Sequence, residues 1–238
     1  MAIKWHEGTL TKVQPVTKNT SLFFLKAEEF KNFDFKPGQF ITLDLPIADK
    51  PSRRWRSFSI ASAPDGNELE LVIVHLKGGA GSTYLFKEAK IGEKIRFQGP
   101  KGIFTLPEKI DRDLFMICTG TGIAPYRSML QDLKNRKYIS EHNIYLIFGT
   151  RTQKDLLYVD EMKNFEKNIS NFYYIPTLSR EKWAGETGYV HAIYERLSSK
   201  KQPAHFFVCG WREMVKEARQ RIKAIGYDRK AIHQELYG

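Results

Sequence analysis

The chain has 238 residues, of which 42% are hydrophobic and 27% charged, a composition typical of a folded globular protein and not of a disordered one. Its two cysteines, Cys118 and Cys209, exclude a disulfide framework and a four-thiolate metal or iron–sulfur centre. The net charge of +11 favours anionic partners, but Lys and Arg are dispersed and no nucleic-acid motif occurs, so we expect no nucleic-acid binding.

No apolar run reaches the roughly 18–20 residues that a membrane-spanning helix needs, so we expect no integral membrane association. The start of the chain lacks the apolar stretch of a signal peptide, which favours a cytoplasmic location. The sequence leaves the oligomeric state open, and a monomer is the working expectation.

The first half of the chain, from Thr9 to about Gln98, consists of short β-rich runs. Residues 39–45 and 68–74 alternate apolar and polar side chains or carry β-branched runs, and Pro-Gly and Pro-Asp-Gly turns separate the runs. Closely spaced strands with turns between them predict an antiparallel barrel or sandwich.

Within this half, residues 53–60 bring a cation, an aromatic ring and a hydroxyl close together. On a strand, Arg56 and Phe58 lie on the same side, and Ser59 follows them. Such a set suits a phosphate, a stacked ring and a hydrogen bond at the ring edge. An exposed basic edge strand is the alternative interpretation.

A glycine-rich cluster follows at residues 77–85. Its small residues expose consecutive amide groups, Ser82 and Thr83 add hydroxyls, and Lys77 adds positive charge. These are the features of an anion-binding concavity. A flexible surface loop is the alternative interpretation.

The second half of the chain changes to apolar strands that alternate with amphipathic helical stretches. We expect strands at residues 114–118, 144–148, 172–175 and 205–209. Such a pattern predicts a parallel sheet with helices on both faces. With a connection near residues 104–112, the sequence predicts a β domain at 1–106 and an α/β domain at 113–238.

A glycine turn, Gly120-Thr121-Gly122-Ile123-Ala124-Pro125, follows the first of these apolar strands and precedes a helical pattern that begins at Tyr126. At such a junction, backbone amides and the N-terminus of the helix can face a phosphate. The turn lacks the third glycine of the usual dinucleotide fingerprint, so an ordinary tight turn stays open as an alternative.

Taken together, these segments resemble the plant-type ferredoxin–NADP⁺ reductases and their flavoprotein relatives over nearly the whole chain. The motifs that carry the resemblance are Arg56-Ser57-Phe58-Ser59, Gly79-Ala80-Gly81-Ser82, Gly99-Pro100-Lys101-Gly102, the turn from Gly120 to Pro125, Phe148-Gly149-Thr150-Arg151, Cys209-Gly210 and the late Glu235-Leu236-Tyr237. Gly238 is one residue more than the family's ending, which leaves the placement of Tyr237 open.

The resemblance implies a flavin-binding antiparallel β-barrel followed by a Rossmann-like α/β domain that binds a nicotinamide nucleotide. It implies transfer of electrons between NADP(H) and a one-electron carrier, an acidic ferredoxin or a flavodoxin, through bound FAD. FAD is preferred to FMN because the ferredoxin-linked branch uses it. The positive net charge is the feature that would steer an acidic carrier to this chain.

The resemblance also assigns site residues, and it implies no metal. For the flavin these are Arg56, Ser57, Phe58, Ser59, Lys77, Gly79, Gly81, Ser82, Thr83 and Tyr237. For the nucleotide they are Thr119, Gly120, Thr121, Gly122, Pro125, Arg151, Ser179, Arg180, Lys182, Cys209 and Gly210. The residues implied near the path of hydride and proton are Ser59, Cys209 and Glu235.

The choice of nucleotide depends on the segment that begins at Ser179. The resemblance implies that Ser179 and Arg180 receive the 2′-phosphate of NADP(H), with Lys182 adding charge. Residues 183–189 look more like NADH-using reductase subunits of oxygenases. We therefore favour NADP(H), and keep an NADH-dependent reductase component of a multicomponent oxygenase or hydroxylase as the alternative. A non-enzymatic basic adaptor is the hypothesis from a different class.

Overall fold

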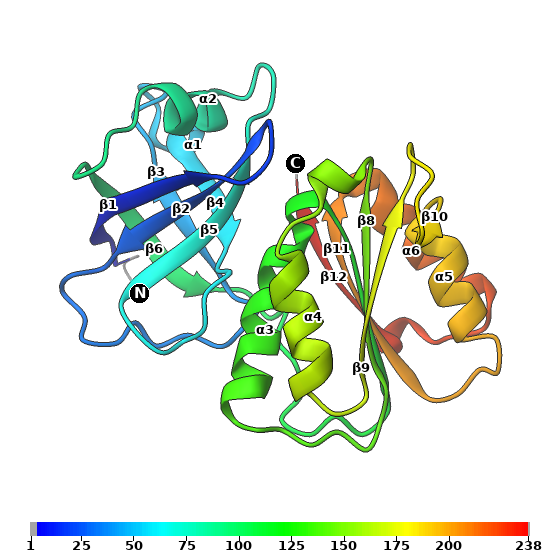
Figure 1. Ribbon diagram of the computed structural model, residues 1–238. Coiled ribbons are helices and arrows are strands. Elements are labelled where there is room, and N and C mark those ends of the chain that lie inside the picture. Colours follow the sequence, from blue (N-terminus) through cyan, green and yellow to red (C-terminus); the bar gives the residue numbers. More distant parts are fainter. Residues whose placement is uncertain (1–3, 238) are drawn as a thin grey trace. The chain divides into compact units, whose positions relative to one another are not determined.

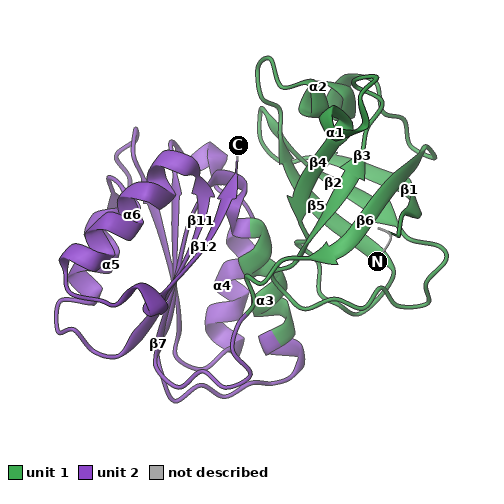
Figure 2. Cartoon of the chain, turned by 180° about the vertical axis from the view of Figure 1, so that it is seen from behind, with its two compact units in different colours: residues 1–105, 124–132 green, residues 106–123, 133–238 purple. Residues whose placement is uncertain are grey.

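The computed structural model describes residues 4–237, which form two compact units (Figures 1 and 2). Unit 1 comprises Met1–Thr105 with Ala124–Asp132, and unit 2 comprises Leu106–Ile123 with Leu133–Gly238. The segment 124–132 thus groups with the N-terminal unit although it follows the start of the C-terminal one. The domain bounds 1–106 and 113–238 stay predictions about which stretches fold independently.

Unit 1 contains an antiparallel sheet of six strands. The strands are β1 (His6–Pro15), β2 (Thr20–Lys26), β3 (Phe40–Asp44), β4 (Trp55–Ser59), β5 (Glu68–Val74) and β6 (Lys94–Lys101). Two short helices, α1 (Pro51–Arg54) and α2 (Ala80–Lys87), accompany them. The strand order is β4-β3-β6-β1-β2-β5, and an antiparallel bridge between Ile60 and Leu71 links its two edges. The sheet therefore closes into a barrel, one of the two architectures that the strand pattern predicted and the one that the family resemblance implies.

The interior of the barrel is filled by the alternate side chains of its strands. Leu69, Leu71 and Ile73 of β5 and Ile41 and Leu43 of β3 belong to one buried apolar cluster. Residues two apart along a strand point to the same face, so these side chains line the interior of the barrel together. This packing fixes the strand register that places the side chains of β4.

Unit 2 contains a parallel sheet of six strands in the order β10-β9-β8-β7-β11-β12. The strands are β7 (Asp113–Thr119), β8 (Ile144–Thr150), β9 (Phe172–Leu178), β10 (Glu186–Thr187), β11 (Ala204–Trp211) and β12 (Ile232–Tyr237). The helices of this half are α3 (Ala124–Asn135), α4 (Val159–Asn168), α5 (Val190–Leu197) and α6 (Arg212–Ala224), with short 3-10 turns η1 (Gly120–Ile123), η2 (Gln153–Asp155) and η3 (Arg229–Ala231). The prediction of a parallel α/β sheet is confirmed, and each of the four predicted strands is present with longer bounds.

The order of the parallel strands reverses in the middle of the sheet. From β7 the chain adds β8 and β9 on one side and then crosses over to add β11 and β12 on the other. In open α/β sheets, ligands bind at the carboxyl ends of the strands beside such a reversal. The carboxyl end of β7, at Thr119, and that of β11, from Cys209 to Trp211, are therefore where a nucleotide site is expected.

The first part of α3 packs within unit 1. The rings of Tyr126 and Phe104 meet at 5.8 Å between centroids. A Cβ placed on Gly38, which has φ +99°, would lie 2.0 Å from the carbonyl oxygen of Phe104 and 2.5 Å from Cε of Met129. Only glycine allows this approach, which explains the glycine at position 38.

Across residues 4–237, each helix is too short or too polar to cross a lipid bilayer.

Candidate functional site

Arg56 of β4 lies against the first turn of α2. A Cβ placed on Gly81 would stand 2.7 Å from Cγ and 3.1 Å from Nε of Arg56, so the arginine stem occupies the space that any larger residue at 81 would fill. One guanidinium nitrogen of Arg56 donates to the carbonyl oxygens of Arg53, at 2.9 Å, and Trp55, at 2.8 Å. Within residues 4–237, no carboxylate lies within ion-pair distance of Arg56.

The start of α2 supplies the amide groups that accompany this guanidinium. The first turn of a helix leaves backbone amides without intrahelical partners and carries a partial positive charge. The amide of Thr83 already bonds the carbonyl of Gly79 at 2.9 Å, so the amides of residues 80–82 are those left for a ligand. Together with Arg56, they form a cradle that fits an anionic diphosphate.

The side chain of Ser82 holds the glycine loop in shape. Its hydroxyl accepts a hydrogen bond from the amide of Leu76 at 3.1 Å and donates one to the carbonyl oxygen of Gly79 at 3.1 Å. The expected hydroxyl donor to a phosphate is thus engaged within the loop, while Lys77 is exposed at its rim. We read Ser82 as the residue that shapes the cradle.

The alternation along β4 matches the expectation from the sequence. Ser57 faces away from the core, and its hydroxyl lies 3.0 Å from that of Thr42 on β3. Phe58 is half-buried and packs against the barrel core, and Ser59 is buried. The strand therefore puts Arg56 and Phe58 on one side and fixes Ser59 at its end.

In unit 2, two glycines allow the strand ends to approach closely at the reversal of strand order. A Cβ on Gly122 would lie 2.4 Å from the carbonyl oxygen of Cys209. A Cβ on Gly210, which has φ +150°, would lie 2.6 Å from Oγ1 of Thr119. That Oγ1 is buried and has no hydrogen-bond partner within the described residues, so a polar group of a ligand can satisfy it.

Cys209 sits beside two residues of the last strand. In the parallel pairing of β11 with β12, Cys209 is in register with Glu235. Burial raises the pKa of the Cys209 thiol well above its usual value, the nearby Glu235 raises it further, and a hydrogen bond from Tyr237 acts in the opposite direction. Cys209 is therefore an uncharged thiol at neutral pH and not a thiolate nucleophile.

A third group of predicted residues lies where β8 and β9 end. The amide of Ser179 donates to the carbonyl of Thr150 at 3.0 Å, and the amide of Arg180 donates to that of Arg151 at 2.9 Å. These bonds tie the two loops side by side, so both arginines project from neighbouring backbones. In the described part of the chain, Arg151, Arg180 and Lys182 are exposed and have no ion-pair partner.

The segment after Lys182 folds back on itself. Nε1 of Trp183 donates to the carbonyl of Glu186 at 2.6 Å, and a Cβ on Gly185 would lie 2.5 Å from the Trp183 ring. Arg196 of α5 pairs with the Glu186 carboxylate at 2.5 Å. This segment is thus an ordered turn that directly follows Lys182 and leads into β10.

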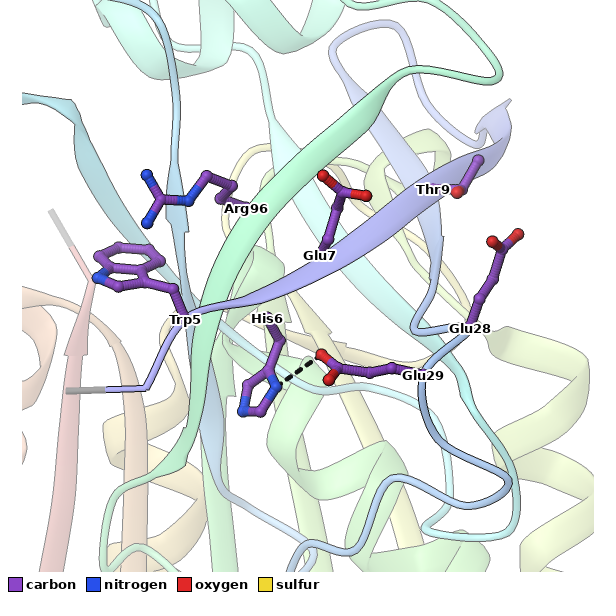
Figure 3. A pocket seen from close by; sticks show the side chains of 7 residues that line it. All are labelled: Trp5, His6, Glu7, Thr9, Glu28, Glu29 and Arg96. Carbon is purple, nitrogen blue, oxygen red and sulfur yellow. Dashed lines mark hydrogen bonds and ion pairs between the residues drawn. The ribbon is translucent and has the colours of Figure 1, made fainter. Parts of the chain in front are cut away.

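One pocket of unit 1 was not anticipated from the sequence. It has a volume of about 460 Å³ and is lined by Trp5, His6, Glu7, Thr9, Glu28, Glu29 and Arg96 (Figure 3). His6 pairs with Glu29 at 2.7 Å, Glu7 pairs with Lys94 at 2.7 Å, and Arg96 lies over the Trp5 ring. Because most of its charges are already paired, the pocket adds no candidate for chemistry. Residues 4–237 contain no cluster of three side chains arranged to hold a metal.

Sequence reasoning also missed an ion pair between Arg127 of α3 and Glu70 of β5, at 2.9 Å. The two residues are 57 positions apart, and neither belongs to a motif that marks the other. No signal in the sequence points to this contact.

Two family models match the chain. The oxidoreductase FAD-binding domain matches residues 7–106, and the oxidoreductase NAD-binding domain matches residues 116–220. Ferredoxin–NADP reductase B of Sorangium cellulosum is 34% identical over 97% of this chain and 97% of its own length. The anthranilate 1,2-dioxygenase electron transfer component of Acinetobacter baylyi is 30% identical over 87% of this chain, which spans 59% of that relative.

Solved structures agree with the two-unit architecture. A ferredoxin NADP⁺ reductase from Neisseria gonorrhoeae with bound FAD and NADP has a TM-score of 0.81 at 25% identity, with 99% of each chain covered. A cytochrome P450 reductase of Amycolatopsis has a TM-score of 0.85 at 23% identity, covering 99% of this chain and 71% of its own, which shows a shared fold.

Proposed function

This chain belongs to the ferredoxin–NADP reductase family of oxidoreductases, and from that premise we propose that it moves electrons between NADP(H) and a one-electron carrier, with FAD as its resident cofactor. The observation that carries the proposal is that one chain holds a candidate site for each of two nucleotides, one in each unit. The cradle of Arg56 and α2 suits a flavin dinucleotide, and the glycine junction at Gly122 and Gly210 suits a nicotinamide nucleotide.

We assign the flavin to β4 and the loop before α2. Arg56 and the amides of residues 80–82 bind the diphosphate, and Phe58 contacts the ring. Ser59 holds a hydrogen bond to the redox edge of the ring. We assign to Tyr237 the second aromatic contact, as its position in the family motif implies. FAD held by these residues would supply the chemistry that the side chains of this protein lack, namely the uptake of two electrons together and their release one at a time.

The nucleotide is assigned to the carboxyl ends of the parallel strands. The glycine turn from Gly120 to Gly122 faces its diphosphate, and Oγ1 of Thr119 bonds a polar group of the nicotinamide end. Arg180, together with Arg151 and Lys182, receives the 2′-phosphate. Guanidinium groups without carboxylate partners are available to a dianionic phosphate, which favours NADP(H) over NADH.

The residues beside the glycine junction complete the proposed chemistry. Cys209, as a neutral thiol, excludes water from the hydride path without adding charge to it. Glu235, in register with Cys209, is the carboxyl group that holds and passes the proton accompanying the hydride. Catalysis is thus mainly positioning in a site from which water is excluded.

We propose that the one-electron carrier is an acidic ferredoxin or a flavodoxin. We also propose that the protein is a monomer and acts in the cytoplasm. The net charge of +11 supports an acidic partner because complementary charge raises the rate of encounter. The rate of electron transfer should therefore fall as ionic strength rises.

A second function is favoured by two specific observations. The turn at residues 183–189 differs from the plant pattern, and the dioxygenase electron transfer component described above is 30% identical. Under this alternative the chain is an NADH-dependent reductase component of an oxygenase or hydroxylase. Steady-state kinetics with the two nicotinamide nucleotides separate the candidates, since the leading proposal requires the larger kcat/KM with NADPH.

The first experiment is a visible spectrum of the purified protein, followed by release and chromatography of its pigment. The proposal predicts FAD and no FMN. A colourless protein that neither FAD nor FMN reconstitutes would support a non-enzymatic basic adaptor instead.

A further inference from the structure

The chain segment that follows β4 is held by hydrogen bonds from several elements. The amide of Ile60 donates to the carbonyl of Gln39 at 3.0 Å, and the amide of Ala61 donates to the carbonyl of Glu70 at 2.8 Å. Ser59 itself is paired with Phe40 across β3 and β4. Ser59–Ala61 is therefore fixed by its amides from the barrel side.

The carbonyl of the same segment is held from a different element. One guanidinium nitrogen of Arg127 donates to the carbonyl oxygen of Ala61 at 2.9 Å and to Oε2 of Glu70 at 2.9 Å. The side chain of Arg127 is 12% exposed and that of Glu70 9%, so these contacts are largely shielded from water. Arg127 lies in the first turns of α3, which begins directly after the glycine turn η1.

Such a contact fixes geometry more than it stabilises the fold. Charged groups form short, directional hydrogen bonds, and these are strong where water is excluded. The cost of removing two charges from water offsets much of that attraction, so a buried ion pair adds little net stability compared with an apolar pair of similar size. The role of this contact is therefore to hold the carbonyl of Ala61 and the carboxylate of Glu70 in place.

We infer that Arg127, held by Glu70, is a positioning residue that fixes Ser59–Ala61 so that the Ser59 hydroxyl faces the redox edge of the flavin. The inference rests on the proposed function, because it concerns how Ser59, a residue assigned to the flavin, is held in place. Arg127 contacts the carbonyl of Ala61, two residues after Ser59, and the proposed role acts through that contact.

The test compares four variants as holoenzymes, with each rate expressed per bound flavin. Arg127→Met combined with Glu70→Leu replaces the ion pair by an apolar pair, so that no buried charge is left alone. Arg127→Lys keeps the charge but loses the fork of donors, and Glu70→Gln keeps the shape of the acceptor. Arg221→Met is the matched control, because Arg221 bridges Glu195 and Glu217 on the exposed surface of unit 2.

The readouts are the rate of flavin reduction at saturating NADPH, the KM for NADPH, the visible spectrum of the bound flavin and the midpoint of thermal unfolding. We expect the double variant to reduce its flavin about tenfold more slowly than the wild type, with a shifted flavin spectrum and an unchanged KM. We expect Arg127→Lys and Glu70→Gln to be about threefold slower, because each retains part of the contact. The control should match the wild type.

A double variant that unfolds at a lower temperature but reduces its flavin at the wild-type rate would show a merely structural role and overturn the inference. A raised KM with an unchanged maximal rate would also overturn it. If the double variant retains no flavin, the two single substitutions decide: wild-type rates and spectra in both contradict the inference. Failure of the proposed function is a separate result, since the wild-type protein would then bind no flavin or would not be reduced by NADPH.

Discussion

Arg56 and Gly81 are in direct contact: the arginine stem fills the space beside the glycine, where a Cβ would stand 2.7 Å from Cγ of Arg56. The contact joins β4 of the barrel to the first turn of α2, through two residues that are 25 positions apart in the chain. It brings a guanidinium and unpaired helix amides to one place, and this is the part of the structure best suited to a diphosphate.

The first prediction concerns this cradle. Arg56→Met should weaken FAD binding by about tenfold to a hundredfold, because a charged hydrogen bond to the diphosphate is lost while the apolar stem is kept. The Kd of FAD, from titration of the apoprotein followed by flavin fluorescence, checks this. Arg53→Met is the control, since only the backbone carbonyl of Arg53 contacts Arg56. Equal affinities in the two variants would contradict the assignment.

The second prediction concerns the glycine junction of unit 2. Gly122→Ala should lower the free energy of unfolding by about 1–3 kcal/mol and weaken nucleotide binding, because the new Cβ forces η1 away from Cys209. Urea denaturation and a nucleotide titration measure the two effects. Gly66→Ala is the control, since a Cβ there meets nothing within 4 Å. If Gly122→Ala binds NADP⁺ as tightly as the wild type, the glycine junction is not part of the nucleotide site.

The third prediction concerns the choice of nucleotide. Arg180→Ala should raise the KM for NADPH at least about tenfold and leave the KM for NADH within about twofold, because only NADPH carries the 2′-phosphate. Arg219→Ala, on the exposed side of α6, serves as the control and should change neither value. Equal changes in both KM values after Arg180→Ala would refute its role at the phosphate.

The fourth prediction is a pH dependence of stability. Burial raises the pKa of both thiols, Cys118 and Cys209, above the usual value of 9.0, so the native state keeps protons that the unfolded state loses in alkaline solution. With more protons bound to the native state, the free energy of unfolding falls as pH rises past about 9, at most about 2.7 kcal/mol per pH unit for two thiols.

Urea denaturation between pH 8 and pH 11 measures this slope. Tyrosines whose pKa values are raised by burial, among them Tyr84, Tyr174 and Tyr194, steepen the loss further toward the upper end of that range. Cys118→Ala should reduce the slope between pH 9 and 10 by about half of the thiol contribution. A stability that stays constant through this window would contradict the burial of the two thiols.

The fold could be predicted largely from the sequence because its signals are local. The apolar runs of β7 and β11 and the turns between the barrel strands are visible in consecutive residues, and their periodicity follows from strand geometry. Alternation along β4 likewise predicted that Arg56 and Phe58 share a face. These inferences need no knowledge of distant parts of the chain.

The features that could not be predicted from the sequence depend on loop geometry and on contacts between residues far apart in the chain. Nothing near Ser82 indicates that its hydroxyl turns inward to Leu76, because loop geometry decides which of several acceptors it reaches. Arg127 in α3 gives no sign that it pairs with Glu70, nor that the segment 124–132 groups with the barrel. Side-chain partners of this kind are set by tertiary packing, which local sequence patterns do not reveal.

The central claim, that this chain moves electrons between NADP(H) and a one-electron carrier through FAD, is tested most directly by an anaerobic titration followed in the visible spectrum. We predict that one equivalent of NADPH bleaches the bound flavin, and that about two equivalents of a one-electron acceptor restore its colour, because one hydride carries two electrons. A protein whose flavin keeps its colour after NADPH is added, or whose reduced flavin passes nothing to the acceptor, would contradict the claim.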